Sequence, residues 1–234
     1  MNNIVAEKRY IASKLGVPYE SLSQSYLRAE TELGTQSVID FTLQTNKVLA
    51  PVISERLLDL NDEFVITHFN VGLKFVADKD NQTAQLDAPV QTYDSDSFGT
   101  GEDYTATQSM NVASIYNGDL SFTIDRTEFI PNFPVRAFYR VPDVLQAEAG
   151  SVAVGIPVIQ NNIVATSVER LAQTETSLYG FYPSEPTKID GRQTIDLSIN
   201  LGANVDMTPN ASIGFGTNYC VFEARGYLIT NAND

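Results

Sequence analysis

The sequence has little of several residue types from which common active sites and stabilising frameworks are built. It contains one cysteine, one histidine and no tryptophan among its 234 residues. A single cysteine, Cys220, excludes an intramolecular disulfide and a cysteine-based zinc site. A single histidine, His68, leaves little material for a histidine-rich metal site or a Ser-His-Asp triad. Cys220 stands in an alternating run, so we expect it to be a buried small side chain and not a reactive thiol.

Basic residues are also scarce. The chain has 15 Lys and Arg against 29 Asp and Glu, a formal net charge of −14. Nucleic-acid binding draws much of its affinity from the neutralisation of phosphates by Lys and Arg, and anionic membrane surfaces attract basic segments. We therefore expect no direct contact with nucleic acid and no membrane association. In a dense assembly, this negative charge would have to be paired or tolerated.

Long hydrophobic runs and glycine-rich phosphate loops are missing as well. No apolar run approaches the roughly 18 residues that cross a bilayer. Residues 1–16 mix charged and apolar side chains, which does not fit a secretory signal. The glycines at 99 and 101 lack the following lysine and helix of a phosphate-binding loop.

The strongest pattern that is present has a period of two. It lies within residues 55–76. From Val65 onward, the odd-numbered positions alternate with more polar even-numbered ones, His68, Asn70, Gly72 and Lys74. The alternating set is Val65, Thr67, Phe69, Val71, Leu73 and Phe75. Such alternation is typical of a strand with one buried face. Its length predicts a strand that crosses the centre of a sheet.

Similar alternation recurs along the chain and predicts an all-β fold. It is found at residues 36–43, 120–125, 195–201 and 219–229. We also expect strands at 105–116 and 135–139 and a tight hairpin turn at Asn117-Gly118. About eight to ten strands, separated by turn residues without alternating helices, indicate an antiparallel β-sandwich. Long strands with long connections favour a jelly roll over an immunoglobulin-like domain.

The N-terminus follows a different period. Apolar residues recur at three- and four-residue steps, which predicts helices at 4–15 and 19–33. We therefore divide the chain into a helical N-terminal arm, residues 1–34, and a β-sandwich domain, residues 35–234. The arm could pack on its own body or dock on a neighbouring subunit. Its candidate interface residues are Ile4, Ile11, Leu15, Tyr19, Leu22 and Tyr26.

An acidic loop is the best candidate for a ligand site. Asp94, Asp96, Glu102 and Asp103 surround the two glycines, and carboxylate oxygens suit Ca²⁺. Counting from Asp94 as the first position of a calcium loop places Thr105 at the twelfth, where a bidentate Glu is required. We therefore expect a solvated loop and no cofactor, with calcium as the alternative.

Carboxylate-based hydrolysis is a third class of function to weigh. Glu128, Asp143 and Glu223 lie among strands and aromatic residues, but their pairing in space is not visible in the sequence. Tryptophan, a common stacking platform for sugars, is absent. The chain has 11 tyrosines, several near expected loops, and exposed tyrosines favour protein interfaces. We expect no enzymatic activity.

Several segments together resemble structural proteins of bacteriophage virions, in particular capsid or capsid-decorating components. They are the N-terminus, SERLLDLNDEFVITHFNVGL, SLYGFYPSEPTKIDGRQTIDLSINL and VFEARGYLIT. The resemblance implies an assembly role, as a β-sandwich or jelly-roll subunit that trimerises or docks on a shell. We therefore expect a non-enzymatic subunit of a virion assembled in the host cytoplasm, forming a trimer or larger and contacting other capsid proteins. The acidic charge favours an outer or auxiliary position. The alternative is a ligand-binding sandwich, lectin-like or adhesin-like, using the acidic loop.

Overall fold

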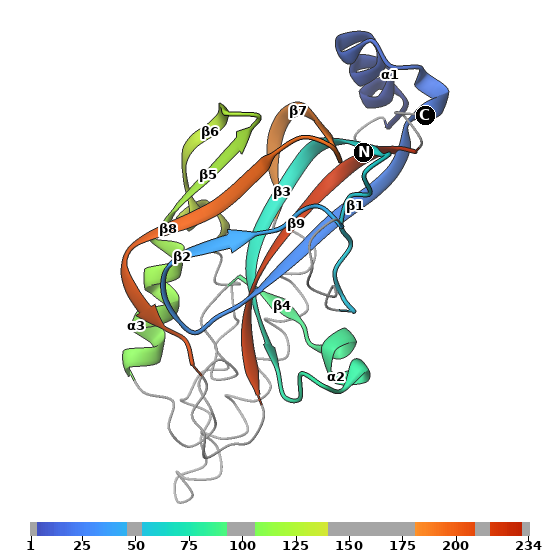
Figure 1. Ribbon diagram of the computed structural model, residues 1–234. Coiled ribbons are helices and arrows are strands. Elements are labelled where there is room, and N and C mark those ends of the chain that lie inside the picture. The colour runs from blue at the N-terminus through green and yellow to red at the C-terminus, as the bar shows by residue number, and fades with distance from the viewer. Residues whose placement is uncertain (1–3, 46–52, 93–105, 140–180, 209–215, 231–234) are drawn as a thin grey trace, which may run out of the picture.

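The computed structural model describes residues 4–45, 53–92, 106–139, 181–208 and 216–230, which form two antiparallel sheets (Figure 1). Sheet A has the order β1 (Ser23–Glu32), β9 (Thr217–Ile229), β3 (Glu63–Val76), and β3 also pairs with β4 (Val90–Gln91) and β7 (Tyr182–Asp190). Sheet B has the order β2 (Thr35–Phe41), β8 (Ile195–Asp206), β5 (Asp119–Ile124), β6 (Thr127–Pro134). The expected all-β antiparallel sandwich is confirmed.

The strands pair in a nested order. β1 pairs with β9, β2 with β8, β3 with β7, and β5 with its neighbour β6. The chain therefore runs out along four strands and returns along their partners in reverse order. The short β4 is added beside the far end of β3.

The main hydrophobic core lies between the two sheets. Phe69 on β3 is at its centre, with ring centroids 5.4 Å from Phe133 and Phe138 and 6.2 Å from Phe222 and Tyr182. Sheet B supplies alternate residues such as Leu120 and Ile199, both fully buried. Residues from both halves of the chain meet here, so the core closes only when the nested strands have paired.

β3 is the central strand that its sequence predicts, but its buried face changes parity. A bulge between Ile66 and His68 interrupts its pairing with β7 and with β9. Phe64 and Ile66 point into the main core before the bulge, whereas Phe69 and the odd positions after it do so beyond the bulge. Val65 lies in a separate cluster outside the main core. Placing Val65 and Thr67 on one face with Phe69 was therefore wrong, because a bulge inserts one extra residue.

The N-terminal helix α1 (Ile4–Leu15) is confirmed, but the expected second helix over 19–33 is wrong. A 3₁₀ turn, η1 (Tyr19–Ser21), leads directly into strand β1. All ten residues of β1 pair with β9. Leu27 and Ala29 enter the core on alternate positions, so tertiary pairing overrides the helical spacing of the apolar residues. The helical part of the expected arm ends at Leu15, and residues 23–32 belong to sheet A.

Three other local expectations are corrected. Residues expected as a strand form helix α3 (Ala106–Tyr116), which places Val112, Ile115 and Tyr116 in the core at helical spacing. The expected edge strand is the 3₁₀ turn η4 (Val135–Phe138). Asn117-Gly118 joins α3 to β5 and is not a hairpin turn. The hairpin turn between β5 and β6 is instead Asp125-Arg126, with φ of 48° and 69° as a type I′ turn requires.

A short helix, α2 (Gln82–Asp87), is capped by the side chain of Asn81.

A candidate binding groove on sheet A

The outer face of sheet A carries rows of polar and charged side chains. The strand register places Arg28, Glu223 and Asn70 in one row across β1, β9 and β3. Tyr26, Arg225 and His68 form the next row. Because side chains alternate across a strand, these residues face away from the core that Leu27, Ala29, Phe222 and Ala224 help to fill.

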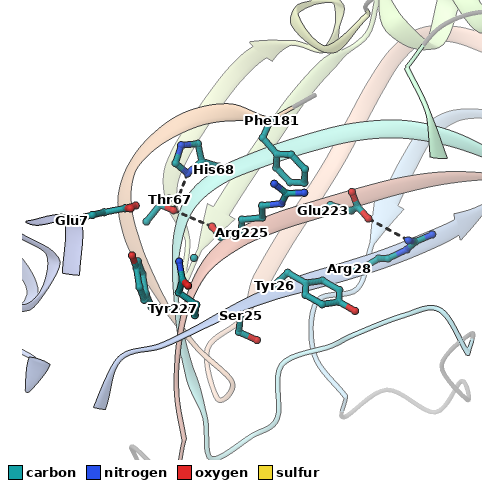
Figure 2. Close-up of a pocket in the computed structure, with 12 residues that line it drawn as sticks. Glu7, Ser25, Tyr26, Arg28, Thr67, His68, Phe181, Glu223, Arg225 and Tyr227 are labelled. Carbon is teal, nitrogen blue, oxygen red and sulfur yellow. Dashed lines mark hydrogen bonds and ion pairs between the residues drawn. The ribbon is translucent and has the colours of Figure 1, made fainter. Parts of the chain in front are cut away.

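Two adjoining hollows form a groove along this face, here called the sheet A groove. The first, about 590 Å³, extends from Glu7 on α1 to Arg28 (Figure 2). The second, about 340 Å³, continues to residues 86–90 and Thr92. Arg28, Phe181, Glu223 and Arg225 line both hollows, so the groove is continuous across the three strands.

A network of ion pairs lies beneath one side of the groove. Arg28 donates from Nη1 to Glu223 at 3.2 Å and from Nε to Glu30 at 2.8 Å. The Lys74 Nζ lies 2.9 Å from Glu30 Oε2, and the side chains of Lys74 and Glu30 are fully buried. Ser54 completes the network, because its hydroxyl donates to Glu30 and accepts from Lys74. These contacts hold the Arg28 guanidinium in place at the edge of the groove.

Arg225 and Phe181 form the opposite side. The Arg225 guanidinium carbon lies 3.7 Å from the centroid of the Phe181 ring, a close cation–π contact. The Thr67 hydroxyl donates to the Arg225 carbonyl at 3.2 Å and lies 3.0 Å from His68 Nδ1. The lone histidine is therefore a hydrogen-bonded residue in the wall of the groove (Figure 2).

Burial shifts the pKa of several groups around the groove. Desolvation raises the pKa of Glu223, although Arg28 and Arg225 oppose the shift. Desolvation lowers the pKa of Lys74, and its hydrogen bond with Glu30 opposes that shift. Burial and then the charge of Glu7 raise the pKa of Tyr227 to about 12, so this phenol stays protonated near neutral pH. The groove therefore contains both charge signs together with neutral hydrogen-bonding groups.

Asn70 provides an unsatisfied acceptor in this groove. Its side chain is on the groove-lining face of β3, the residue is 5% exposed, and its Oδ1 has no hydrogen-bond partner among the described residues. Buried polar atoms are nearly always hydrogen-bonded. A ligand that donates a hydrogen bond would satisfy Asn70, while Arg28 and Arg225 could donate to its oxygens. The arrangement is suited to binding a polar molecule.

Of the residues proposed from the sequence as metal ligands or paired carboxylates, Glu223 lines this groove. Asp94, Asp96, Glu102 and Asp103, the calcium candidates, lie outside the described residues, as does Asp143. Glu128 is exposed on β6 in sheet B, whereas Glu223 is on β9 in sheet A, so the two are not paired. Among the described residues, no group of three or more His, Cys, Asp or Glu could hold a metal ion.

The candidate interface residues of the N-terminus divide by exposure. Ile11 and Leu22 are buried within this chain, in a cluster with Val65, Tyr227 and Ile229. Leu15 packs partly against the same cluster, and Tyr19 is half-buried. Ile4 and Tyr26 are 48% and 46% exposed. In this conformation, only Ile4 and Tyr26 of the six are widely accessible to another molecule.

Of the residues that define the groove, the sequence singled out Glu223, His68 and, as a candidate interface residue, Tyr26. Arg28 and Glu223 are 195 positions apart and meet only through the pairing of β1 with β9. The available signal was the presence of charged side chains near the centres of alternating strands, where Arg225 and Lys74 also stand. That signal shows that a polar face exists but not which residues share it.

Comparisons with protein-family models, with curated proteins and with solved structures find no significant match to this chain. In the described part of the chain, none of the helices has the length and hydrophobicity to cross a membrane.

Proposed function

We propose that the protein is a non-enzymatic structural subunit of a bacteriophage particle, a capsid or capsid-decorating protein with a jelly-roll fold. The observation that carries the proposal is the nested pairing of β1 with β9, β2 with β8, β3 with β7 and β5 with β6. Rolling four such pairs into two facing sheets gives a jelly roll, an architecture used by viral capsid proteins and also by lectins. The fold supports this function by analogy with viral capsid proteins, since one fold can serve many functions.

Two further observations favour a role in assembly. The sequence segments that resemble phage structural proteins include β7, most of β3 and β9, and the first part of β8. The first turn of α1 and Tyr10 expose apolar surface that the described residues leave uncovered, with Ile4 at 48%, Val5 at 45% and Tyr10 at 56% exposure. The subunit would act through homo-oligomers, trimers or larger, and through contacts with other capsid proteins in the virion.

The oligomeric state tests this proposal. We expect light scattering behind size exclusion to show a trimer or larger for the full chain, stable on dilution. Deleting residues 1–34 is unsuitable because it would remove strand β1. The triple variant Ile4→Ser/Val5→Ser/Tyr10→Ser instead removes the exposed apolar side chains of α1. This variant should dissociate while its circular dichroism is unchanged. A monomer at all concentrations for the full chain would overturn the proposal.

A second candidate function is ligand binding through the sheet A groove. The buried Oδ1 of Asn70 favours it, because this acceptor has no hydrogen-bond partner among the described residues and belongs to a residue that lines the groove. A glycan array probed with and without a chelator would test this function. Binding that is lost in Arg225→Ala but kept in Arg136→Ala, an exposed arginine in η4, would locate the ligand in the groove. Binding that only the chelator abolishes would point to the acidic loop instead, and no binding to any glycan would remove a glycan-binding role.

A further inference from the structure

We propose that helix α1 of one copy docks on the outer face of sheet B of a second copy. The inference rests on the proposed assembly function and names the two surfaces that meet. Such a contact joins different patches on the two partners, so it repeats head to tail and produces a closed ring or an extended array.

The charge of α1 is opposite to that of the whole chain. The helix has three basic residues, Lys8, Arg9 and Lys14, and one acidic residue, Glu7, in a chain of net charge −14. Lys14 pairs with Glu185 on β7, and Lys8 lies 4.5 Å from the Tyr19 ring centroid. Arg9 is exposed, and because it precedes the buried Ile11 by two positions it lies on the opposite side of the helix. α1 therefore presents positive charge to the surroundings.

The apolar stripe of α1 extends beyond the body that it covers. Ile11 and Leu15 pack on the cluster formed with Val65, Tyr227 and Ile229. Ile4 lies on the same stripe, since it precedes Ile11 by about two turns, but it is 48% exposed. Figure 1 shows α1 standing at one end of the sandwich, beyond the sheets. On the side of α1 away from Ile11, Val5 and Arg9 lie one turn apart and are exposed, as is Tyr10, so this side is available to another molecule.

The outer face of sheet B is the complementary surface. The strands β2, β8, β5 and β6 contain no lysine or arginine. The exposed acidic residues of these strands are Asp40, Asp119, Glu128, Asp196 and Asp206. Val38 is 42% exposed on the same face, beside Asn200 and Asp119 in one row. This surface offers an apolar contact surrounded by negative charge.

Two other surfaces are less suited to bind α1: the outer face of sheet A, and the outer face of sheet B in the same copy. The strands of sheet A include Arg28, Lys74, Lys188 and Arg225, and the first three pair with carboxylates. α1 is attached to sheet A through Ile11 and through the Lys14–Glu185 pair, whereas the outer face of sheet B is on the opposite side of the sandwich. A second copy is therefore the occupant that the charges favour.

A charge-swap experiment on the full chain tests the docking. Arg9→Glu and Asp196→Lys should each weaken self-association by about tenfold in sedimentation equilibrium at low salt, and the double variant should recover most of the loss. The wild-type association should also weaken as NaCl rises, because salt screens exposed charges. Lys79→Glu and Asp80→Lys, exposed charges outside both surfaces, make the same changes in net charge and should leave association unchanged.

The outcomes separate this inference from the proposed function. Recovery in the double variant supports the docking of α1 on sheet B. Oligomers that persist unchanged in both single variants would overturn the docking and leave the assembly function standing. A wild-type chain that is monomeric at every concentration would overturn both. Thermal melting of each variant confirms that the exposed substitutions leave the fold intact.

Discussion

The ammonium of Lys74 lies 2.9 Å from the carboxylate of Glu30, and both side chains are completely buried. Strand β9 lies between β3, which bears Lys74, and β1, which bears Glu30. The pair therefore bridges across the middle strand on the outer side of sheet A. Arg28 and Ser54 also bind Glu30, so the carboxylate has three partners whereas Lys74 has Glu30 and Ser54.

Breaking this pair should destabilise the fold strongly. Lys74→Met removes the charge that balances Glu30 in a buried site, and loss of one member of a buried pair costs about 3–5 kcal/mol. Urea unfolding should show a fall in the free energy of unfolding near the lower end of that range, because Arg28 still binds Glu30. Lys79→Met is the matched control, since Lys79 is exposed and 3.8 Å from Glu32, where the expected change is within about 0.5 kcal/mol. Equal stability of Lys74→Met and the wild type would contradict the prediction.

Glu223 should make stability depend on pH in an unusual direction for a carboxyl group. Burial raises its pKa above the ordinary value of 4.5, so the folded state binds this proton more tightly than the unfolded state. The contribution of the protonated Glu223 to the free energy of unfolding is largest below the pKa of the unfolded state. It is lost as the pH rises through the higher pKa of the folded state. Relative to Glu223→Gln, the wild type should therefore gain stability as pH falls from 7 toward 4.5. Urea titrations of both proteins at several pH values measure this difference, and a constant difference would show that the pKa is not raised.

Cys220 should be inert in the folded protein. Its side chain is fully buried on β9, and burial raises the pKa of the thiol to about 12. Because the thiolate is the reactive form, labelling by a disulfide reagent at pH 8 should be at least about a hundredfold slower than in urea-unfolded protein. The kinetics of thionitrobenzoate release provide the measurement. Rapid labelling under native conditions would mean that β9 opens locally.

Gly226 should not tolerate a side chain. It pairs with Ile66 at the bulge of β3, and a Cβ added there would lie 1.8 Å from the carbonyl oxygen of Val65. The backbone must move to accept it, so Gly226→Ala should cost about 3 kcal/mol or more, at the high end for single substitutions. Gly34→Ala is the control, because a Cβ there meets nothing within 4 Å. A melting temperature for Gly226→Ala equal to that of the control would refute the close approach.

The local alternation in the sequence was sufficient to predict the strands that form most of the two sheets. In β8, Ile195, Leu197 and Ile199 are buried while Asp196 and Asn200 are exposed, as the alternation indicates. The same pattern located β2, β3 and β9, and the spacing of Ile4, Ile11 and Leu15 located α1. These predictions succeed because a strand or helix with one buried face must repeat its apolar residues at its own period.

The errors arose where tertiary contacts choose between local alternatives. Residues 23–32 contain Leu, Arg, Ala and Glu, which favour a helix, yet ten consecutive pairings with β9 make them a strand. The bulge in β3 moved Val65 and Thr67 off the face that simple alternation assigned to them. Both outcomes depend on a partner strand about 160 to 200 positions away in the chain, which no local pattern specifies.

The sequence by itself determined the spacing of the apolar residues that face the core and the overall negative charge of the chain. Only the tertiary structure decided which polar residues share a site. Arg28, Asn70, Glu223 and Arg225 come from three strands and form one groove through the register of β9 between β1 and β3. Register is a property of paired strands, and a shift of β9 by one residue would turn Glu223 and Arg225 toward the core, away from Arg28 and Asn70.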